Sequence, residues 1–336
     1  MAFLSEIPDI HWRNPIFCSI LGNTRLSTVP GISGAGPTAE ATLLTPVLDA
    51  ELITNGTITS APIKPNTPTG CPTPASITRA MMELTGITPL FINAGLRYPL
   101  TVPAIDALGE VGEDPRFRDA VPRAHDLYAR GEMIGRFLSA YSDLLILGEC
   151  VPGGTTTALC VLRALGYEAT VSSSFAENPV SQKEQVCTLV LARMATFGIS
   201  APLDVVRCTG DPMMPVAAGI AHTYTGTIVL AGGTQMLAVC GVIKAMGYQL
   251  PLIATTAYVR DDPTANVVKV AKKIGAKMFF VDPGFGDIGH SGLARYCIGE
   301  VKEGMGAGGA LFLAHLMGFT PEEIQKKVLD TVRAYS

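Results

Sequence analysis

Short apolar runs alternate with longer apolar segments of helical character along most of the chain. Beyond residue 140 the short runs predict strands at 143–149, 203–210, 226–233, 251–259 and 276–284. The segments between them predict helices near 156–165, 184–197, 213–224, 234–246 and 264–274. This alternation is typical of an α/β fold, a parallel Rossmann-like sheet with helices on both faces. Ligands of such sheets bind at the carboxyl ends of the strands.

The first 140 residues are less regular. Apolar runs predict strands at 14–21, 50–56 and 88–95 in the same sheet, and helices follow at 74–85 and about 122–141. Two Gly/Pro-rich loops, 29–41 and 61–74, are long for a compact domain, and loops of that kind are usually functional. The last segment, 320–335, is amphipathic and opens with Thr320 and Glu323, the signature of a capping box. We expect this helix to pack outside the sheet, in a small lobe or at a dimer contact.

Composition narrows the functional class. Of the 336 residues 48% are hydrophobic and 16% are charged, so much of the surface is expected to be buried within the fold or between subunits. The net charge of −4 and the lack of a basic stripe argue against nucleic-acid binding. The apolar runs are too short to span a membrane, and the start of the chain lacks a secretory pattern. Eight scattered cysteines without a CxxC pair indicate reduced thiols in a cytoplasmic protein, with no metal site.

The segment "GECVPGGTTT" (148–157) joins a predicted strand to a predicted helix. Backbone N–H groups and hydroxyls at such a helix N-terminus favour an anion, phosphate above all. A plain turn with a threonine cap is the alternative. The carboxylate of Glu149 favours a ligand site, because an acid at this edge can accept hydrogen bonds from a ribose. The candidate ligand residues are Gly148, Glu149, Gly153, Gly154, Thr155 and Thr156.

Three further clusters fall at predicted ligand-binding edges. In "VKEGMGAGG" (301–309), Glu303 precedes Gly304 and Gly306; it is either a general base or an acid that favours a helix N-terminus. Gly232 and Gly233 follow the strand at 226–233. In "DPGFGDIGHSG" (282–292), we expect Gly289, His290 and Ser291 to line a phosphate site rather than to form a catalytic pair, although a lone histidine is more often a structural hydrogen-bonding group.

Two segments have the glycine spacing of a dinucleotide fingerprint, namely "GAGPTA" (34–39) and "GMGAGG" (304–309). The first follows a Pro-Gly turn instead of a strand, and the second lies too close to the end of the chain for the rest of a Rossmann site. A P-loop motif is absent, as is the paired-acid loop of the common phosphoribosyltransferase fold. An NAD(P)-dependent oxidoreductase and a non-catalytic nucleotide-binding protein remain as alternatives.

Five segments together resemble the nicotinate-nucleotide–dimethylbenzimidazole phosphoribosyltransferase family, and most closely its divergent archaeal and cyanobacterial branch. The similarity runs in order from about residue 70 to 317 and is strongest at the two glutamate motifs. The segments are "TPASITRAMMELTG" (73–86), "LGECVPGGTTTALCVLRAL" (147–165), "TGDPMMPVAAGIA" (209–221), "DIGHSGL" (287–293) and "KEGMGAGGALFLAHL" (302–316).

This resemblance implies an activity and a site. The expected reaction transfers phosphoribosyl from nicotinate mononucleotide to 5,6-dimethylbenzimidazole or a related base, giving the α-ribazole phosphate of the cobalamin nucleotide loop. It implies that Glu303 is the base, and that Glu149, Gly153, Gly154, Thr155 and Thr156 hold the ribose and phosphate, with residues 289–292 nearby. No cofactor or metal is implied.

The resemblance also implies an α/β domain over 14–318 and a small helical lobe from 1–13, 319–336 and nearby helices, in a homodimer or higher homo-oligomer. Two positions depart from the family pattern: Gly154 replaces an asparagine, and Ala75 replaces a glutamine close to the benzimidazole. The ribotide half of the site is therefore better supported than the identity of the acceptor base.

Overall fold

The sheet has seven parallel strands. The computed structural model describes residues 2–335 and orders the strands β3-β2-β1-β4-β5-β6-β7. In chain order they are β1 (Pro15–Gly22), β2 (Leu90–Gly95), β3 (Ala104–Asp106), β4 (Leu144–Cys150), β5 (Thr227–Ala231), β6 (Leu252–Thr256) and β7 (Met278–Val281). From β1 the chain proceeds through β2 to β3 at one edge, and it then returns to β4 beside β1 and proceeds to β7 at the other edge. The strand order therefore reverses between β1 and β4. In doubly wound sheets this switch point is where ligands bind. The predicted α/β Rossmann-like class is confirmed.

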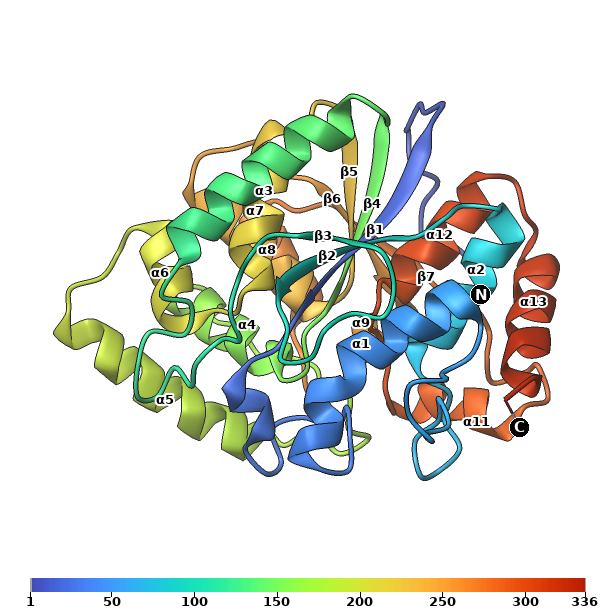
Figure 1. Cartoon of the computed structure of the whole chain (residues 1–336), viewed down its shortest axis with the longest axis horizontal. Coiled ribbons are helices and arrows are strands. Elements are labelled where there is room, and N and C mark those ends of the chain that lie inside the picture. Colours follow the sequence, from blue (N-terminus) through green and yellow to red (C-terminus); the bar gives the residue numbers. More distant parts are fainter. Residues whose placement is uncertain (1, 336) are drawn as a thin grey trace.

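Helices cover both faces of the sheet (Figure 1). One face carries α3 (Ala124–Ser139), α4 (Gly154–Ala164), α5 (Val180–Thr196), α6 (Pro202–Thr209), α7 (Met213–Thr223), α8 (Thr234–Ala245) and α10 (Val267–Ile274). The other carries α1 (Ala39–Asn55), α2 (Pro74–Thr85), α12 (Ala307–Leu316) and α13 (Pro321–Arg333). Short helices complete the chain: η1 (Arg25–Thr28), α9 (Ala257–Arg260), α11 (Ser291–Ala294) and η2 (Arg295–Ile298).

Each face has its own hydrophobic core because successive side chains of a strand point to opposite faces. In β4, Leu145 and Leu147 belong to the core under α3–α8, whereas Leu144 and Ile146 belong to the core under α1, α2 and α12. Strands buried on both sides read as continuous apolar runs, which is why the sequence pattern located β4 so well.

Two predicted strands are wrong. Residues 203–210 lie in helix α6, which begins at Pro202 and buries Val205 and Cys208 on one side. Residues 50–56 are the end of helix α1, which stops at Gly56 in a left-handed conformation. Strand β3 was not predicted, and the strand expected over 251–259 ends at Thr256, where α9 follows.

Helix α13 packs against α2 and α12, and its N-terminus has the capping box of Thr320 and Glu323. The boundaries predicted for a separate lobe stay a prediction. None of the helices within residues 2–335 combines the length and the apolar character needed to cross a membrane. All eight cysteines in this part of the chain are free thiols, and Cys297 is the exposed one.

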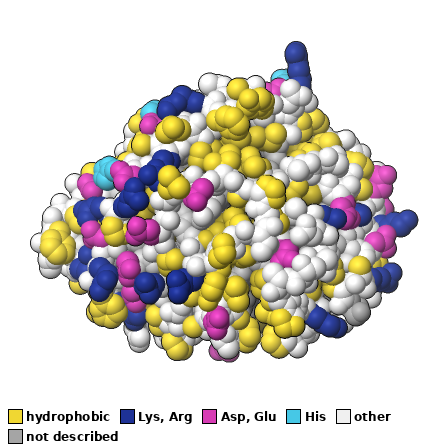
Figure 2. All heavy atoms as spheres, in the orientation of Figure 1, with side chains coloured by type: hydrophobic (Ala, Val, Ile, Leu, Met, Phe, Trp, Pro, Cys, Tyr) yellow, Lys and Arg dark blue, Asp and Glu magenta, His cyan; other side chains and the backbone are white. Residues whose placement is uncertain are grey.

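Charged side chains are unevenly spread over the visible face of the molecule. They gather over α3, α5 and α6 and over α13, and the middle of this face is mostly apolar or uncharged (Figure 2). Three large apolar side chains on or just after α3 are more than half exposed: Met133, Phe137 and Tyr141. An apolar surface of this kind is what a subunit contact uses, but the predicted homodimer stays a prediction.

Candidate active site

The site forms where the ends of β4, β5 and β6 meet the N-terminus of α12. Helix α12 lies against these three strands, and glycines let its backbone approach them closely. A Cβ atom on Gly306 would lie 3.1 Å from the Cα atom of Gly148 and 3.2 Å from the Cβ atom of Ala231. This contact brings the loop that carries Glu303 to the strand end that carries Glu149.

Glu149 is 5% exposed, and its Oε2 atom accepts hydrogen bonds from the Val151 N–H, at 3.2 Å, and from the side-chain amide of Gln235 on α8. Its Oε1 atom faces Gly232, where a Cβ would lie 3.5 Å away. Burial, followed by the charges of Asp211 and Glu303, raises the pKa of the Glu149 carboxyl to about 8. Near neutral pH this carboxyl is therefore mostly protonated and can donate a hydrogen bond.

Glu303 is partly buried and has two donors on each carboxylate oxygen. Oε1 accepts from the N–H groups of Gly304 at 3.2 Å and Gly308 at 3.0 Å; Oε2 accepts from Thr255 Oγ1 at 2.9 Å and the Thr256 N–H at 3.1 Å. Because Gly308 lies in the first turn of α12, the carboxylate also complements the helix dipole. Burial outweighs these donors and raises the pKa of Glu303. The side chain is thus fixed in position and is more basic than an ordinary carboxylate.

The predicted phosphate loop leads into α4. Gly153 caps this helix with a φ of 79°, and the N–H groups of Gly154 and Thr156 donate to the carbonyls of Val151 and Gly153, both at 2.9 Å. A Cβ on Gly154 would lie 2.5 Å from Nε2 of Gln235. Within residues 2–335 the buried Thr156 hydroxyl has no hydrogen-bond partner. A phosphate here would use this hydroxyl and the remaining amides, because two N–H groups of the loop already have acceptors.

The other predicted residues divide into two groups. Gly232 and Gly233 lie between Glu149 and α8, and Gly233 is the N-cap of α8. Gly289, His290 and Ser291 lie at the start of α11, where Nδ1 of His290 accepts from the Leu293 N–H at 3.1 Å. Among the described residues no hydrogen bond joins these three to Glu149 or Glu303.

Two more buried carboxyls, not predicted from the sequence, lie around this site. Asp211 precedes α7 and accepts hydrogen bonds from Thr157 Oγ1 at 2.7 Å and the Met213 N–H at 3.2 Å; burial raises its pKa to about 6. Asp49 on α1 accepts from Thr73 Oγ1 at 3.1 Å, and burial raises its pKa to about 7. Asp211 lies within the segment 209–221 that carries the resemblance, which was the available signal.

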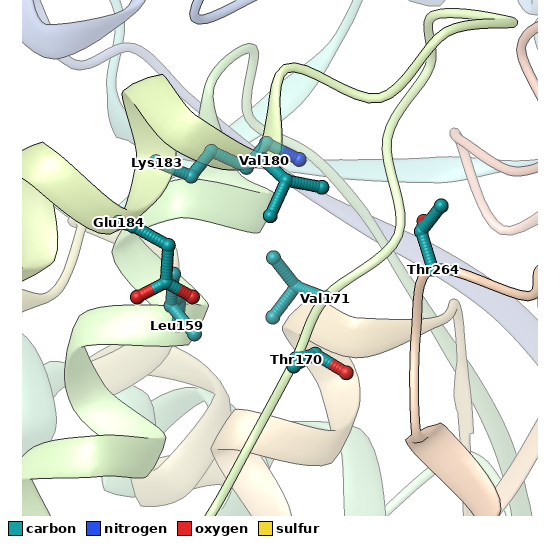
Figure 3. Close-up of a pocket in the computed structure, with 7 residues that line it drawn as sticks. All are labelled: Leu159, Thr170, Val171, Val180, Lys183, Glu184 and Thr264. Atoms are coloured by element: carbon teal, nitrogen blue, oxygen red, sulfur yellow. The ribbon is translucent and has the colours of Figure 1, made fainter.

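Two buried lysines, Lys183 and Lys302, lie near the carboxylate of Asp262. Lys183 on α5 donates to the Ser172 carbonyl at 2.6 Å, and burial together with the charge of Lys302 lowers its pKa to about 7. Below Lys183 is a hollow of about 10 Å³, room for one water molecule, across which Val171 and Val180 face each other (Figure 3). The apolar pattern of α5 gave no sign that Lys183 would be buried.

The chain matches no family model. It is 44% identical over 326 residues to the UPF0284 protein of Methanosarcina acetivorans, covering 94% of this chain and 93% of that protein. It is 43% identical over 327 residues to the UPF0284 protein of Thermococcus gammatolerans, covering 95% and 97%.

Two solved structures from Thermus thermophilus have a similar fold at 15% sequence identity. One is nicotinate-nucleotide-dimethylbenzimidazole phosphoribosyltransferase, with a TM-score of 0.63 and coverage of 96% of this chain and 83% of that chain. The other is CobT, with a TM-score of 0.62 and coverage of 97% and 85%. The resemblance seen in the sequence motifs is thus matched by the fold. The chain belongs to the UPF0284 protein family, and its fold is that of the nicotinate-nucleotide–dimethylbenzimidazole phosphoribosyltransferase from Thermus thermophilus.

Proposed function

We propose that the protein transfers the phosphoribosyl group of nicotinate mononucleotide to 5,6-dimethylbenzimidazole or a related base and releases nicotinate. The observation that carries the proposal is the meeting of Glu149 and Glu303, which are 154 positions apart in the sequence, at the carboxyl edge of the sheet. They are close enough that the charge of Glu303 raises the pKa of Glu149. The names of the two structural neighbours add support, because they have the same fold.

Glu303 would act as the general base. The acceptor base attacks the C1′ atom of the ribose through one ring nitrogen, while the N–H proton of its other nitrogen passes to the Glu303 carboxylate. The bond from C1′ to the pyridinium nitrogen breaks, and neutral nicotinate nitrogen leaves with the electron pair. A positioned base contributes about 10²–10⁴-fold to such a step. Attack opposite the leaving group inverts C1′ and gives the α-linked product.

Glu149 would hold the ribose. At neutral pH its mostly protonated carboxyl can donate to a ribose hydroxyl. The buried carboxyls of Asp49, Asp211 and Glu303 give the site a negative potential once they ionise, and that potential favours both the pyridinium ring and an oxocarbenium-like ribose. The phosphate would bind at the N-terminus of α4 through Thr156 and nearby amides.

The two alternative functions are less well supported. The segment 34–39 lies between η1 and α1, and 304–309 follows η2, so neither glycine cluster follows a strand as a dinucleotide site requires. A dehydrogenase would change nicotinamide absorbance without releasing nicotinate. A non-catalytic binding protein would saturate with nicotinate mononucleotide and release nothing.

The test is nicotinate release with a panel of benzimidazoles and purines, for the natural chain and for Glu303→Gln. We expect release by the natural chain with at least one base, and at least 100-fold slower turnover for Glu303→Gln with nucleotide affinity within about threefold. Glu322→Gln, at an exposed position of α13, is the matched control. No release with any base refutes the proposed function, and full turnover by a folded Glu303→Gln refutes the base assignment.

A further inference from the structure

The loop that presents Glu303 has an unfavourable backbone conformation. Val301, Lys302 and Met305 have φ angles of 67°, 56° and 49°, in the left-handed region. A residue with a side chain loses about 1–2 kcal/mol there, and a β-branched residue such as valine is a genuine outlier. Such strain persists only where the surroundings fix the backbone, and it concentrates at functional sites. Contacts with the surrounding structure must therefore hold this loop in its left-handed conformation.

Lys302 makes several of the contacts that hold it. Its Nζ atom lies 3.3 Å from Oδ2 of Asp262, and the two side chains are 5% and 4% exposed. The same ammonium donates to the carbonyls of Gly299 at 2.6 Å and Phe175 at 3.3 Å. An ion pair this well buried resists screening by salt, and breaking it leaves an uncompensated charge.

Asp262 is fixed independently of Lys302. Its Oδ2 atom accepts from Ser172 Oγ at 2.7 Å, and its Oδ1 atom accepts from Thr264 Oγ1 at 2.6 Å and from the Thr264 N–H at 2.9 Å. The carboxylate is thus a rigid anchor, and the lysine on the strained loop is the element that depends on it.

Thr256, at the end of β6, links this anchor to the carboxylate of Glu303. Its hydroxyl donates to the Lys302 carbonyl at 2.7 Å, and its N–H donates to Oε2 of Glu303 at 3.1 Å. Thr256 therefore fixes both the backbone of Lys302 and the carboxylate of Glu303 relative to the sheet. If residue 302 relaxed out of the left-handed region, its carbonyl would turn away from Thr256 and Glu303 would lose its alignment.

We propose that Lys302, paired with Asp262, is a positioning residue that holds the strained loop and so aims Glu303 at the N–H of the acceptor base. The inference rests on the proposed function for the role of Glu303. The pairing itself is a property of the fold and can be tested without substrate.

Activity provides the first test. In Lys302→Met we expect kcat to fall at least tenfold while KM for nicotinate mononucleotide stays within about twofold, because the base is misaligned and the ribotide contacts are intact. Asp262→Asn should lower kcat similarly, and the double variant should be no worse than the poorer single variant, because all three break one pair. Lys302→Gly should retain more kcat than Lys302→Met, because glycine adopts a φ of 56° without needing the ion pair. Lys244→Met, at an exposed position of α8, is the control.

Amide hydrogen exchange provides the second test and requires no activity. The N–H groups of Val301 and Glu303 donate to the carbonyls of Ser174 and Val301, at 2.9 and 2.7 Å. In Lys302→Met they should exchange at least tenfold faster, with the sheet amides unchanged. Unchanged exchange in a folded variant overturns the inference, as does an unchanged kcat, a rise in KM alone, or a Lys302→Gly variant less active than Lys302→Met. If the natural chain transfers no phosphoribosyl group, the proposed function fails and exchange still decides whether the pair holds the loop.

Discussion

Replacing Glu149 by glutamine should flatten the pH dependence of stability. The pKa of this carboxyl rises from the ordinary 4.5 to about 8 in the folded chain. Between these values the native state therefore binds more protons than the unfolded state, so stability is highest at the acidic end and falls as the pH rises. At about 1.4 kcal/mol for each tenfold difference in proton affinity, Glu149 alone accounts for a loss of about 5 kcal/mol across this window. Glutamine has the same shape, still accepts the Val151 N–H and never ionises.

Denaturant unfolding followed by far-UV circular dichroism at about pH 5 and pH 8 measures this difference. Asp49 and Asp211, with pKa values raised to about 7 and 6, add slopes of the same sign and remain in the variant. The stability of the natural chain should thus fall more steeply than that of Glu149→Gln. Glu168→Gln removes a 76%-exposed carboxylate whose pKa is lowered by Lys273 and should keep the steep fall. Parallel curves for the natural chain and Glu149→Gln would show that Glu149 ionises freely and that its burial has no electrostatic cost.

Three further outcomes are expected. Asp211→Asn should lower the pKa of Glu149, because a charge that raises this pKa is removed. In the same unfolding series, the loss of stability caused by ionisation of Glu149 should then be complete at a lower pH. An unchanged pH for this loss would exclude the coupling between the two carboxyls. Thr156→Val should change stability by less than about 1 kcal/mol, since its hydroxyl is already unpaired, yet weaken nicotinate mononucleotide binding about threefold to tenfold by calorimetry; equal affinities would remove Thr156 from the phosphate site. Gly308→Ala should lower Tm and activity, because its Cβ would lie 2.6 Å from Oε2 of Glu303, whereas Gly241→Ala, whose Cβ meets Leu162 at 3.4 Å, should keep both; equal behaviour of the two variants would contradict the packing described.

The sequence pattern predicted most of the sheet because its strands are buried on both faces and are bounded by glycine turns. The pattern failed to identify helices that are buried on every side, because their apolar residues do not recur with a helical period. Residues 46–53 of α1 are buried on every side, so 50–56 could not be distinguished from a strand. The short apolar run of α6 was equally ambiguous, and β3 has only three residues, two of them exposed, which is too short for a pattern to show.

For the candidate site, the glycine-rich surroundings of Glu149 and Glu303 were visible in the sequence, because close backbone approach requires glycine at particular spacings. Asp49, Asp211 and Lys183 were not visible as buried groups. Their burial arises from contacts between elements far apart in the chain, such as the one between Asp211 and Thr157, 54 positions away. A single sequence without relatives contains no record of such contacts.

Helix α12 packs on β4 and β5 through glycines whose backbones contact the strands directly. The separation of Glu149 and Glu303 is consequently set by contacts between main-chain atoms, and hardly at all by the bulk of neighbouring side chains. Substitutions that repack either side of the sheet can accumulate without moving one acid relative to the other. A larger residue at Gly148, Gly306, Gly308 or Gly309 would push the two apart.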